Sequence, residues 1–193
     1  MPIGQAKFGL LGGIADLGKL ELIETQTFTA QSSVIFNDMK ENIYDVHFFV
    51  WSGLRRVTSS SSVVCRFSKD NGSSFISSGY QVAMQYGGNT GGFGELRSTS
   101  TNSITYLSYS NTTTSNANQN GYLYLYNLGN SSKYSFLTNQ SFSQSTSTIA
   151  FFYFGGGVLP TAETHNAVQL LLSGGATISG TFKLYGVKQL WVL

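Results

Sequence analysis

Cysteine and proline are almost absent from this sequence, which has one of the former and two of the latter in 193 residues. A single cysteine excludes a disulfide framework within the chain and a cluster of thiolate metal ligands. Cys65 stands among Val63, Val64 and Phe67, and a cysteine in apolar surroundings behaves as a small hydrophobic side chain. We therefore expect a buried, inert thiol and no metal or other cofactor.

Charged side chains are also scarce, with 11 basic and 9 acidic residues and a net charge of +2. After Asn71 the only carboxylates are Glu95 and Glu163, so little acid–base chemistry can be built from the last two thirds of the chain. The basic residues form no cluster of the kind that binds a phosphate backbone. We expect no nucleic-acid partner.

Long hydrophobic runs are missing. The apolar, glycine-rich stretch from Phe8 to Ala15 stops at Asp16 and has neither a basic leader nor a small-residue cleavage site, which argues against a signal peptide. It is also shorter than the roughly 20 residues that span a bilayer. The expectation is a protein that is not inserted in a membrane and is either soluble or held in an assembly.

What the sequence does contain is the chemistry of strands and turns, because Gly, Ser, Thr and Asn are abundant and 14% of residues are aromatic. Short β-branched and aromatic runs recur between polar breaks, which is typical of a sandwich or barrel. We predict one all-β domain over residues 20–193, an antiparallel jelly-roll-like sandwich of about 8–10 strands, preceded by an irregular assembly arm over residues 1–19. The expected strands are Leu20–Thr29, Ser33–Phe36, Ile43–Ser52, Val63–Ser68, Tyr80–Tyr86, Ile104–Ser110, Gly121–Tyr126, Tyr134–Phe142, Thr148–Phe154, Ala167–Ser173 and Thr177–Val187, the second of which can continue the first.

Local turn signals add detail to this scheme. Asn71-Gly72 tolerates positive φ and predicts a hairpin in which the flanking strands fold back on each other. The stretches Gly87–Arg97 and Asn111–Asn120 are predicted to be surface loops. Phe93, within the first of them, is a candidate for contact with a ligand.

Alternation along one strand predicts a tyrosine surface. In Tyr122-Leu-Tyr-Leu-Tyr126 the two leucines should face the core, and Tyr122, Tyr124 and Tyr126 the opposite side. Two interpretations remain open: the rings contact a ligand, or they simply cover the second face of the sheet.

Two runs are apolar on both faces, Ile43–Trp51 and Thr148–Phe154, so each needs cover on two sides. One side would be the core and the other a neighbouring subunit, the arm or a loop. With the apolar tail Leu190–Leu193, these runs indicate an assembled protein. The candidate assembly contacts are Phe8, Leu10, Leu11, Phe49, Trp51 and Trp191.

Catalytic patterns are sparse. His47 shares a strand face with Asp45, but Phe49 and Trp51 lie on that face too, which favours a packed histidine over a base. The glycine-rich Gly87–Gly94 stretch lacks the helix and Lys-Ser/Thr of a phosphate-binding loop. We therefore predict a non-enzymatic protein.

Arg55-Arg56 follows the Trp51 strand and precedes a serine run. Exposed guanidinium groups there could bind carboxylates or phosphates in a bidentate manner, for example on acidic sugars. A solvated turn without a ligand is the alternative.

The order of several segments resembles a known group of proteins. These segments are Gly18-Lys-Leu-Glu-Leu-Ile-Glu24, Tyr44-Asp-Val46, Arg66–Phe75 with Ser78-Gly-Tyr80, and Ile178-Ser-Gly-Thr-Phe-Lys-Leu-Tyr-Gly-Val-Lys188. Residues 18–188 thereby resemble small virion structural proteins of tailed bacteriophages, of the tail-fibre type. The resemblance implies a jelly-roll-like domain, commonly trimeric, on the outside of a virion, and it implies no catalytic or ligand residues.

Three functions follow from these expectations. The first is a homotrimeric tail-fibre or receptor-binding component, on the outer surface of the virion, that contacts other virion proteins and host-surface glycan. The second is a capsid decoration protein, either cement or head fibre, fastened by its arm and tail. The third and most remote is a polysaccharide depolymerase using acids such as Asp45 or Glu95.

Overall fold

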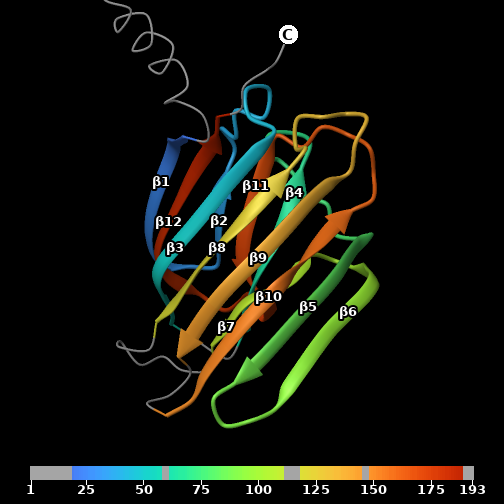
Figure 1. Cartoon of the computed structure of the whole chain (residues 1–193). Coiled ribbons are helices and arrows are strands. Elements are labelled where there is room, and N and C mark those ends of the chain that lie inside the picture. Colours follow the sequence, from blue (N-terminus) through green and yellow to red (C-terminus); the bar gives the residue numbers. More distant parts are fainter. Residues whose placement is uncertain (1–18, 58–60, 111–117, 145–147, 189–193) are drawn as a thin grey trace, which may run out of the picture.

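The computed structural model of this chain describes residues 19–57, 61–110, 118–144 and 148–188. It confirms the predicted fold class, because twelve strands in these residues form two antiparallel sheets (Figure 1). The strands are β1 (Leu20–Gln31), β2 (Ser33–Phe36), β3 (Val46–Arg56), β4 (Ser61–Ser68), β5 (Tyr80–Gly88), β6 (Phe93–Thr101), β7 (Ile104–Ser110), β8 (Gln119–Tyr126), β9 (Ser135–Gln144), β10 (Ala150–Leu159), β11 (Ala167–Leu172) and β12 (Ile178–Val187).

Eight of these strands have the topology of a jelly roll. The larger sheet begins with the order β1-β12-β3-β8, and the smaller sheet is β2-β11-β4-β7. Counted along the chain without β5, β6, β9 and β10, these orders are 1-8-3-6 and 2-7-4-5, the two interleaved Greek keys of a jelly roll.

The remaining four strands widen one sheet. The pair β5–β6 is inserted before β7, and the pair β9–β10 is inserted after β8. They add to the free side of β8 in the order β9-β10-β5-β6, so that the larger sheet has eight strands. Figure 1 shows this extension beside the jelly roll, with β7 of the smaller sheet behind it.

One hydrophobic core lies between the sheets. Phe49, Trp51 and Phe182 of the larger sheet meet Phe36 and Phe67 of the smaller sheet in one cluster. The Phe36 and Phe49 rings pack edge to face with centroids 4.9 Å apart, a geometry that aromatic pairs favour.

This burial corrects one prediction. Phe49 and Trp51 were expected to contact a partner copy, but both are fully buried in the core of their own chain. Phe48, on the other face of β3, is half-buried and packs against the rings of Tyr124 and Tyr185. The second apolar face of this strand is thus partly covered from within the chain. Phe8, Leu10, Leu11 and Trp191 lie outside the described residues.

Strand β9 places mostly polar side chains on its inner face, with Leu137 as the apolar exception, and two phenylalanines on its outer face. Its residues alternate strictly between buried and exposed, yet Ser135, Asn139 and Ser143 are buried while Phe136 and Phe142 are exposed. The Asn139 amide donates to the Leu107 backbone carbonyl oxygen at 2.9 Å. The Ser143 hydroxyl donates to the Tyr109 backbone carbonyl oxygen at 2.7 Å. The inner face of β9 therefore binds backbone carbonyl groups of β7, an edge strand of the smaller sheet.

Two local predictions are wrong. Asn71 and Gly72 do adopt positive φ, 57° and 83°, but the strands on either side do not pair: β4 binds β11 and β7, whereas β5 binds β10 and β6. The turn instead carries the chain from one sheet to the other. The stretch Gly87–Arg97 is a hairpin and not a loop, because its second half forms β6, whose polar sequence gave no strand signal.

Strand β10 contains three successive glycines, Gly155–Gly157. At Gly156 a Cβ atom would lie 2.4 Å from the Leu137 carbonyl oxygen on β9, closer than van der Waals contact allows. Even the smallest side chain would force the two strand backbones apart.

Replacement of Gly156 by alanine is expected to lower the free energy of unfolding by about 1–3 kcal/mol, the usual cost of overpacking a site that cannot relax. Urea denaturation measures the change. Ala83→Ser, an exposed position on the neighbouring strand, is the control and should change stability by less than about 0.5 kcal/mol. Equal stability of the Gly156→Ala variant and the parent would contradict the crowding.

Candidate functional site

The outer face of the eight-stranded sheet carries most of the candidate contact residues. One row of paired residues crosses the whole sheet. From β1 to β6 this row reads Leu22, Tyr185, Phe48, Tyr124, Thr138, Gly156, Ala83 and Arg97. Its side chains are bulky on the jelly-roll strands and small at Thr138, Gly156 and Ala83, so the outer face is raised on one side and hollowed on the other.

The predicted tyrosine surface lies on the raised side. Leu123 and Leu125 are fully buried, and Tyr122 is 37% exposed, as the alternation predicted. The Tyr124 ring packs against Phe48, with centroids 4.8 Å apart, and against Tyr126. The Tyr122 hydroxyl donates to Gln140 and that of Tyr126 lies 3.2 Å from the Thr138 hydroxyl. These rings form a packed layer in which the hydroxyl groups of Tyr122 and Tyr126 are hydrogen-bonded, which favours the covering role.

The most exposed aromatic rings of the outer face lie on the inserted strands. Phe93 is 88% exposed, Phe142 58%, Phe154 45% and Phe136 42%. Of these four, only Phe93 was predicted as a ligand contact. Phe136 and Phe142 were missed because an isolated strand pattern places its phenylalanines in the core, whereas β9 turns them outward. Phe154 lies on β10, in a run that was predicted to be covered on both faces, but its ring is exposed.

A groove of about 790 Å³ lies on this extension. It is lined by three residues from each of β5, β6, β9 and β10 and by none from the jelly-roll strands. Gly156 and Ala83 leave its floor without bulky side chains, and Phe136 stands at its wall. The volume falls within the range of about 300–1,000 Å³ typical of small-molecule sites.

The groove is close to electrically neutral. Arg97 at its edge forms an ion pair with Glu95, with Nε and Oε1 3.3 Å apart, and both side chains are largely exposed. No carboxylate is among the described residues that line the groove. Glycoside hydrolysis uses a pair of carboxyl groups. The described lining of the groove does not contain such a pair.

The predicted arginine pair is not an exposed pair. Both residues belong to β3, and Arg56 is only 4% exposed. Burial lowers the pKa of its guanidinium group, although such a group stays charged at neutral pH. The prediction is therefore wrong for Arg56, while Arg55 is half-buried.

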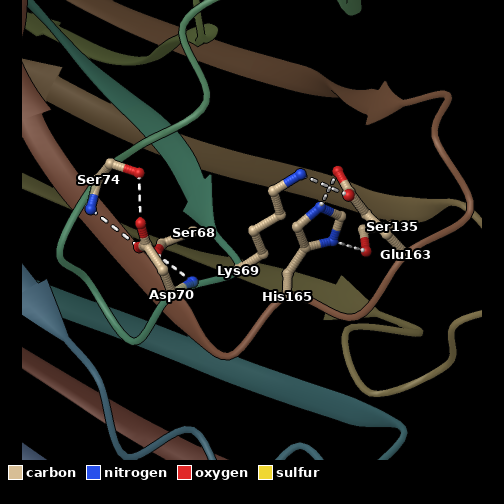
Figure 2. A network of polar contacts seen from close by, with 7 residues as sticks. All are labelled: Ser68, Lys69, Asp70, Ser74, Ser135, Glu163 and His165. Atoms are coloured by element: carbon tan, nitrogen blue, oxygen red, sulfur yellow. Dashed lines mark hydrogen bonds and ion pairs between the residues drawn. The ribbon is translucent and has the colours of Figure 1, made fainter.

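A second group of polar side chains lies at the end of the sandwich where β4, β9 and the β10–β11 loop meet (Figure 2). His165 Nδ1 is 2.8 Å from the Ser135 hydroxyl, and its Nε2 is 3.5 Å from Glu163, which also binds Lys69 at 3.2 Å. A Ser, a His and a carboxylate are the components of a catalytic triad. In such a triad, however, Ser faces Nε2 and the carboxylate faces Nδ1, the reverse of this arrangement.

Burial also separates this group from a working nucleophile. Ser135 and His165 are fully buried, so no substrate carbonyl can reach the hydroxyl group. Burial lowers the pKa of His165, an effect that Glu163 opposes. The His165 backbone N–H donates to the Leu128 carbonyl oxygen, so this residue ties the β10–β11 loop to the larger sheet. This group could not be predicted from the sequence, because its assembly depends on how the β10–β11 loop folds.

The neighbouring turn is held by Asp70. Its carboxylate accepts hydrogen bonds from the Ser74 hydroxyl and backbone N–H and from the Ser68 hydroxyl. Because these bonds favour the ionised form, with Ser74 the largest contributor, the pKa of Asp70 falls to about 2. The Asn71 N–H donates to Asn166, which joins this turn to the β10–β11 loop.

His47 is packed, as predicted. Its ring is fully buried, and Nε2 lies 2.6 Å from the Met39 carbonyl oxygen, so this nitrogen carries the proton and donates it. Burial lowers the pKa of His47 to about 4. Cys65 is also buried, as predicted, and burial raises the pKa of its thiol.

Within residues 19–57, 61–110, 118–144 and 148–188, no three His, Cys, Asp or Glu side chains are grouped closely enough to hold a metal ion. Nor does any helix in them have the length and apolar character to cross a bilayer.

The buried His47 makes stability depend on pH. Its pKa is about 4 in the folded protein and about 6.5 in the unfolded chain. The neutral ring therefore contributes stability above pH 6.5 that is lost as the pH falls toward 4, about 3 kcal/mol in total. In His47→Gln, whose amide can still donate to Met39, the loss between pH 7 and pH 4 should be smaller by that amount. Urea denaturation at both pH values checks this, and an unchanged difference would contradict it.

The burial of Ser135 predicts that a fluorophosphonate probe for activated serines will not label the native protein, under conditions that label trypsin fully. Peptide mass spectrometry detects any adduct. Ser135→Ala should cost roughly 1–3 kcal/mol of stability, because it leaves His165 Nδ1 buried without a partner. Labelling of Ser135 in the folded protein would contradict this interpretation.

Comparison with known proteins returned no match of this chain to a family model, a curated protein or a solved structure. The resemblance to tail-fibre proteins consequently rests on the sequence elements quoted above. A function for this chain has to be argued from its own surfaces, of which the outer face of the eight-stranded sheet is the most distinctive.

Proposed function

We propose that this protein is a non-enzymatic structural component of a bacteriophage virion, of the tail-fibre or receptor-binding type, that contacts glycan on the host surface. The virion setting is supported by the sequence resemblance over residues 18–188. The observation that carries the host contact is the outer face of the inserted strands, where four phenylalanines are exposed and one of them, Phe136, lines a neutral groove. Exposed aromatic patches of this kind mark interaction sites.

We assign assembly to the other edge of the larger sheet, where β1 is the terminal strand. Leu20, Leu22 and Ile43 are exposed there, at the end of the fold where β1 begins and β12 ends, since Leu20 pairs with Val187. The apolar segments 1–18 and 189–193 attach at this end. We propose that these segments and residues join three copies into a homotrimer and connect it to other virion proteins on the outer surface of the particle.

The same apolar end supports a second candidate, a capsid decoration protein, because it could fasten the sandwich to capsid subunits. The two candidates differ in copy number: a tail fibre is present in few copies and a decoration protein in many. They also differ in effect, since only the receptor-binding component has to touch the host.

Two measurements test the proposal. Quantitative mass spectrometry and immunogold labelling of purified particles should find the protein at the tail in a small copy number. Purified protein added to host cells before the phage should reduce adsorption, because it occupies the same glycan. Many copies on the head without inhibition of adsorption would select the decoration protein, and absence from the particle would contradict both candidates.

A further inference from the structure

We propose that the groove on the inserted strands is a binding site for a neutral saccharide, with Phe136 as the surface on which a sugar ring packs. This inference rests on the proposed host contact and assigns it to one place. The site is confined to the two strand pairs that a jelly roll does not require. The jelly-roll strands thus remain free for assembly while the extension binds the ligand.

Strand β9 buries mostly polar side chains. Its inner face carries Ser135, Asn139, Ser141 and Ser143 with one apolar residue, Leu137, whereas two phenylalanines are exposed on its outer face. Burying polar side chains while leaving apolar ones in water is opposite to what core formation favours. The outward aromatic face is therefore a binding surface and not a consequence of packing.

The groove has a shape that fits a sugar ring. Gly156 and Ala83 lie side by side on β10 and β5, and the backbone contact at Gly156 keeps that position free of any side chain. A hollow floor beside an aromatic wall accepts a ring that packs one face against Phe136. A pyranose can present a face of C–H groups to the aromatic ring and direct its hydroxyl groups outward.

Polar side chains border the groove. Gln81, Thr138 and Thr99 border the groove and are exposed. The Gln81 amide has no hydrogen-bond partner among the described residues. An amide offers both donors and an acceptor and a hydroxyl offers one of each, which suits sugar hydroxyl groups.

The charge balance selects neutral ligands. Arg97 is the cation that lines the groove, and Glu95 pairs with it. An anionic sugar would have to displace this carboxylate, and a cationic one would meet Arg97. Lys183, another cation of the larger sheet, lies on β12, outside the groove.

Variants of β9 provide a matched test, because Phe136 and Phe142 lie on the same face of the same strand, six residues or roughly 20 Å apart. Both are exposed, but only Phe136 lines the groove.

The probes are neutral gluco-, galacto- and N-acetylglucosamine oligosaccharides, with a sulfated and a sialylated oligosaccharide for comparison. Binding to the full chain is measured by saturation-transfer NMR and calorimetry. Circular dichroism establishes that each variant is folded.

Binding of at least one neutral oligosaccharide is expected, weakened about tenfold or more in Phe136→Ala, which removes the aromatic surface. Ala83→Trp, which fills the groove from an exposed position, should abolish binding. Phe142→Ala should change affinity less than about twofold. A Gln81→Ala variant should weaken binding without affecting stability.

Three results of the binding experiments would overturn the inference: no neutral oligosaccharide binds at millimolar concentration, affinity persists in Ala83→Trp, or Phe142→Ala weakens binding as much as Phe136→Ala. A concentration-dependent oligomer that Ala83→Trp disrupts, without sugar binding, would assign the groove to a second copy and equally overturn it. These results are independent of the virion experiment: absence of the protein from particles refutes the proposed function even if the groove binds sugar.

Discussion

The pairing of β8 with β9 is the contact on which the rest of the structure depends, because it joins the jelly roll to its four-strand extension. The register sets Leu123 opposite Asn139 and Tyr124 opposite Thr138. A shift of one residue would reverse the two faces of β9. Phe136 and Phe142 would then enter the interior, and Asn139 and Ser143 would leave it. Strand β7 would lose its hydrogen bonds from Asn139 and Ser143, and the outer face would lose its two β9 phenylalanines.

Polar groups inside the sandwich hold this arrangement in place. Asn139 and Ser143 bind carbonyl groups of β7, and Ser135 meets His165 at the start of the same strand. Each of these buried groups costs free energy unless it is paired, so the pairs favour one register over its alternatives. The pairing of Ser135 with His165, which resembles part of a catalytic triad, therefore has a structural explanation.

The extension gives the larger sheet two kinds of outer surface. Over the jelly-roll strands, Phe48, Tyr124 and Tyr185 pack against one another and leave a continuous layer. Over the inserted strands, Gly156 and Ala83 interrupt that layer and Phe136 stands free. Under the proposed function, the first surface is free for assembly and the second for a ligand.

The sequence by itself determined the all-β class, nearly all strands, the inward leucines of β8 and the burial of Cys65 and His47, because period-two alternation and β-branched runs are local signals. It did not determine β6, whose sequence is polar, or the fate of Asn71-Gly72, whose flanking strands join different sheets. The groove combines residues from four strands, from Gln81 to Val158, and the inversion of β9 contradicts the rule that phenylalanine faces the core. Only the tertiary structure decided these features, because strand order and register depend on pairing between segments far apart in the chain.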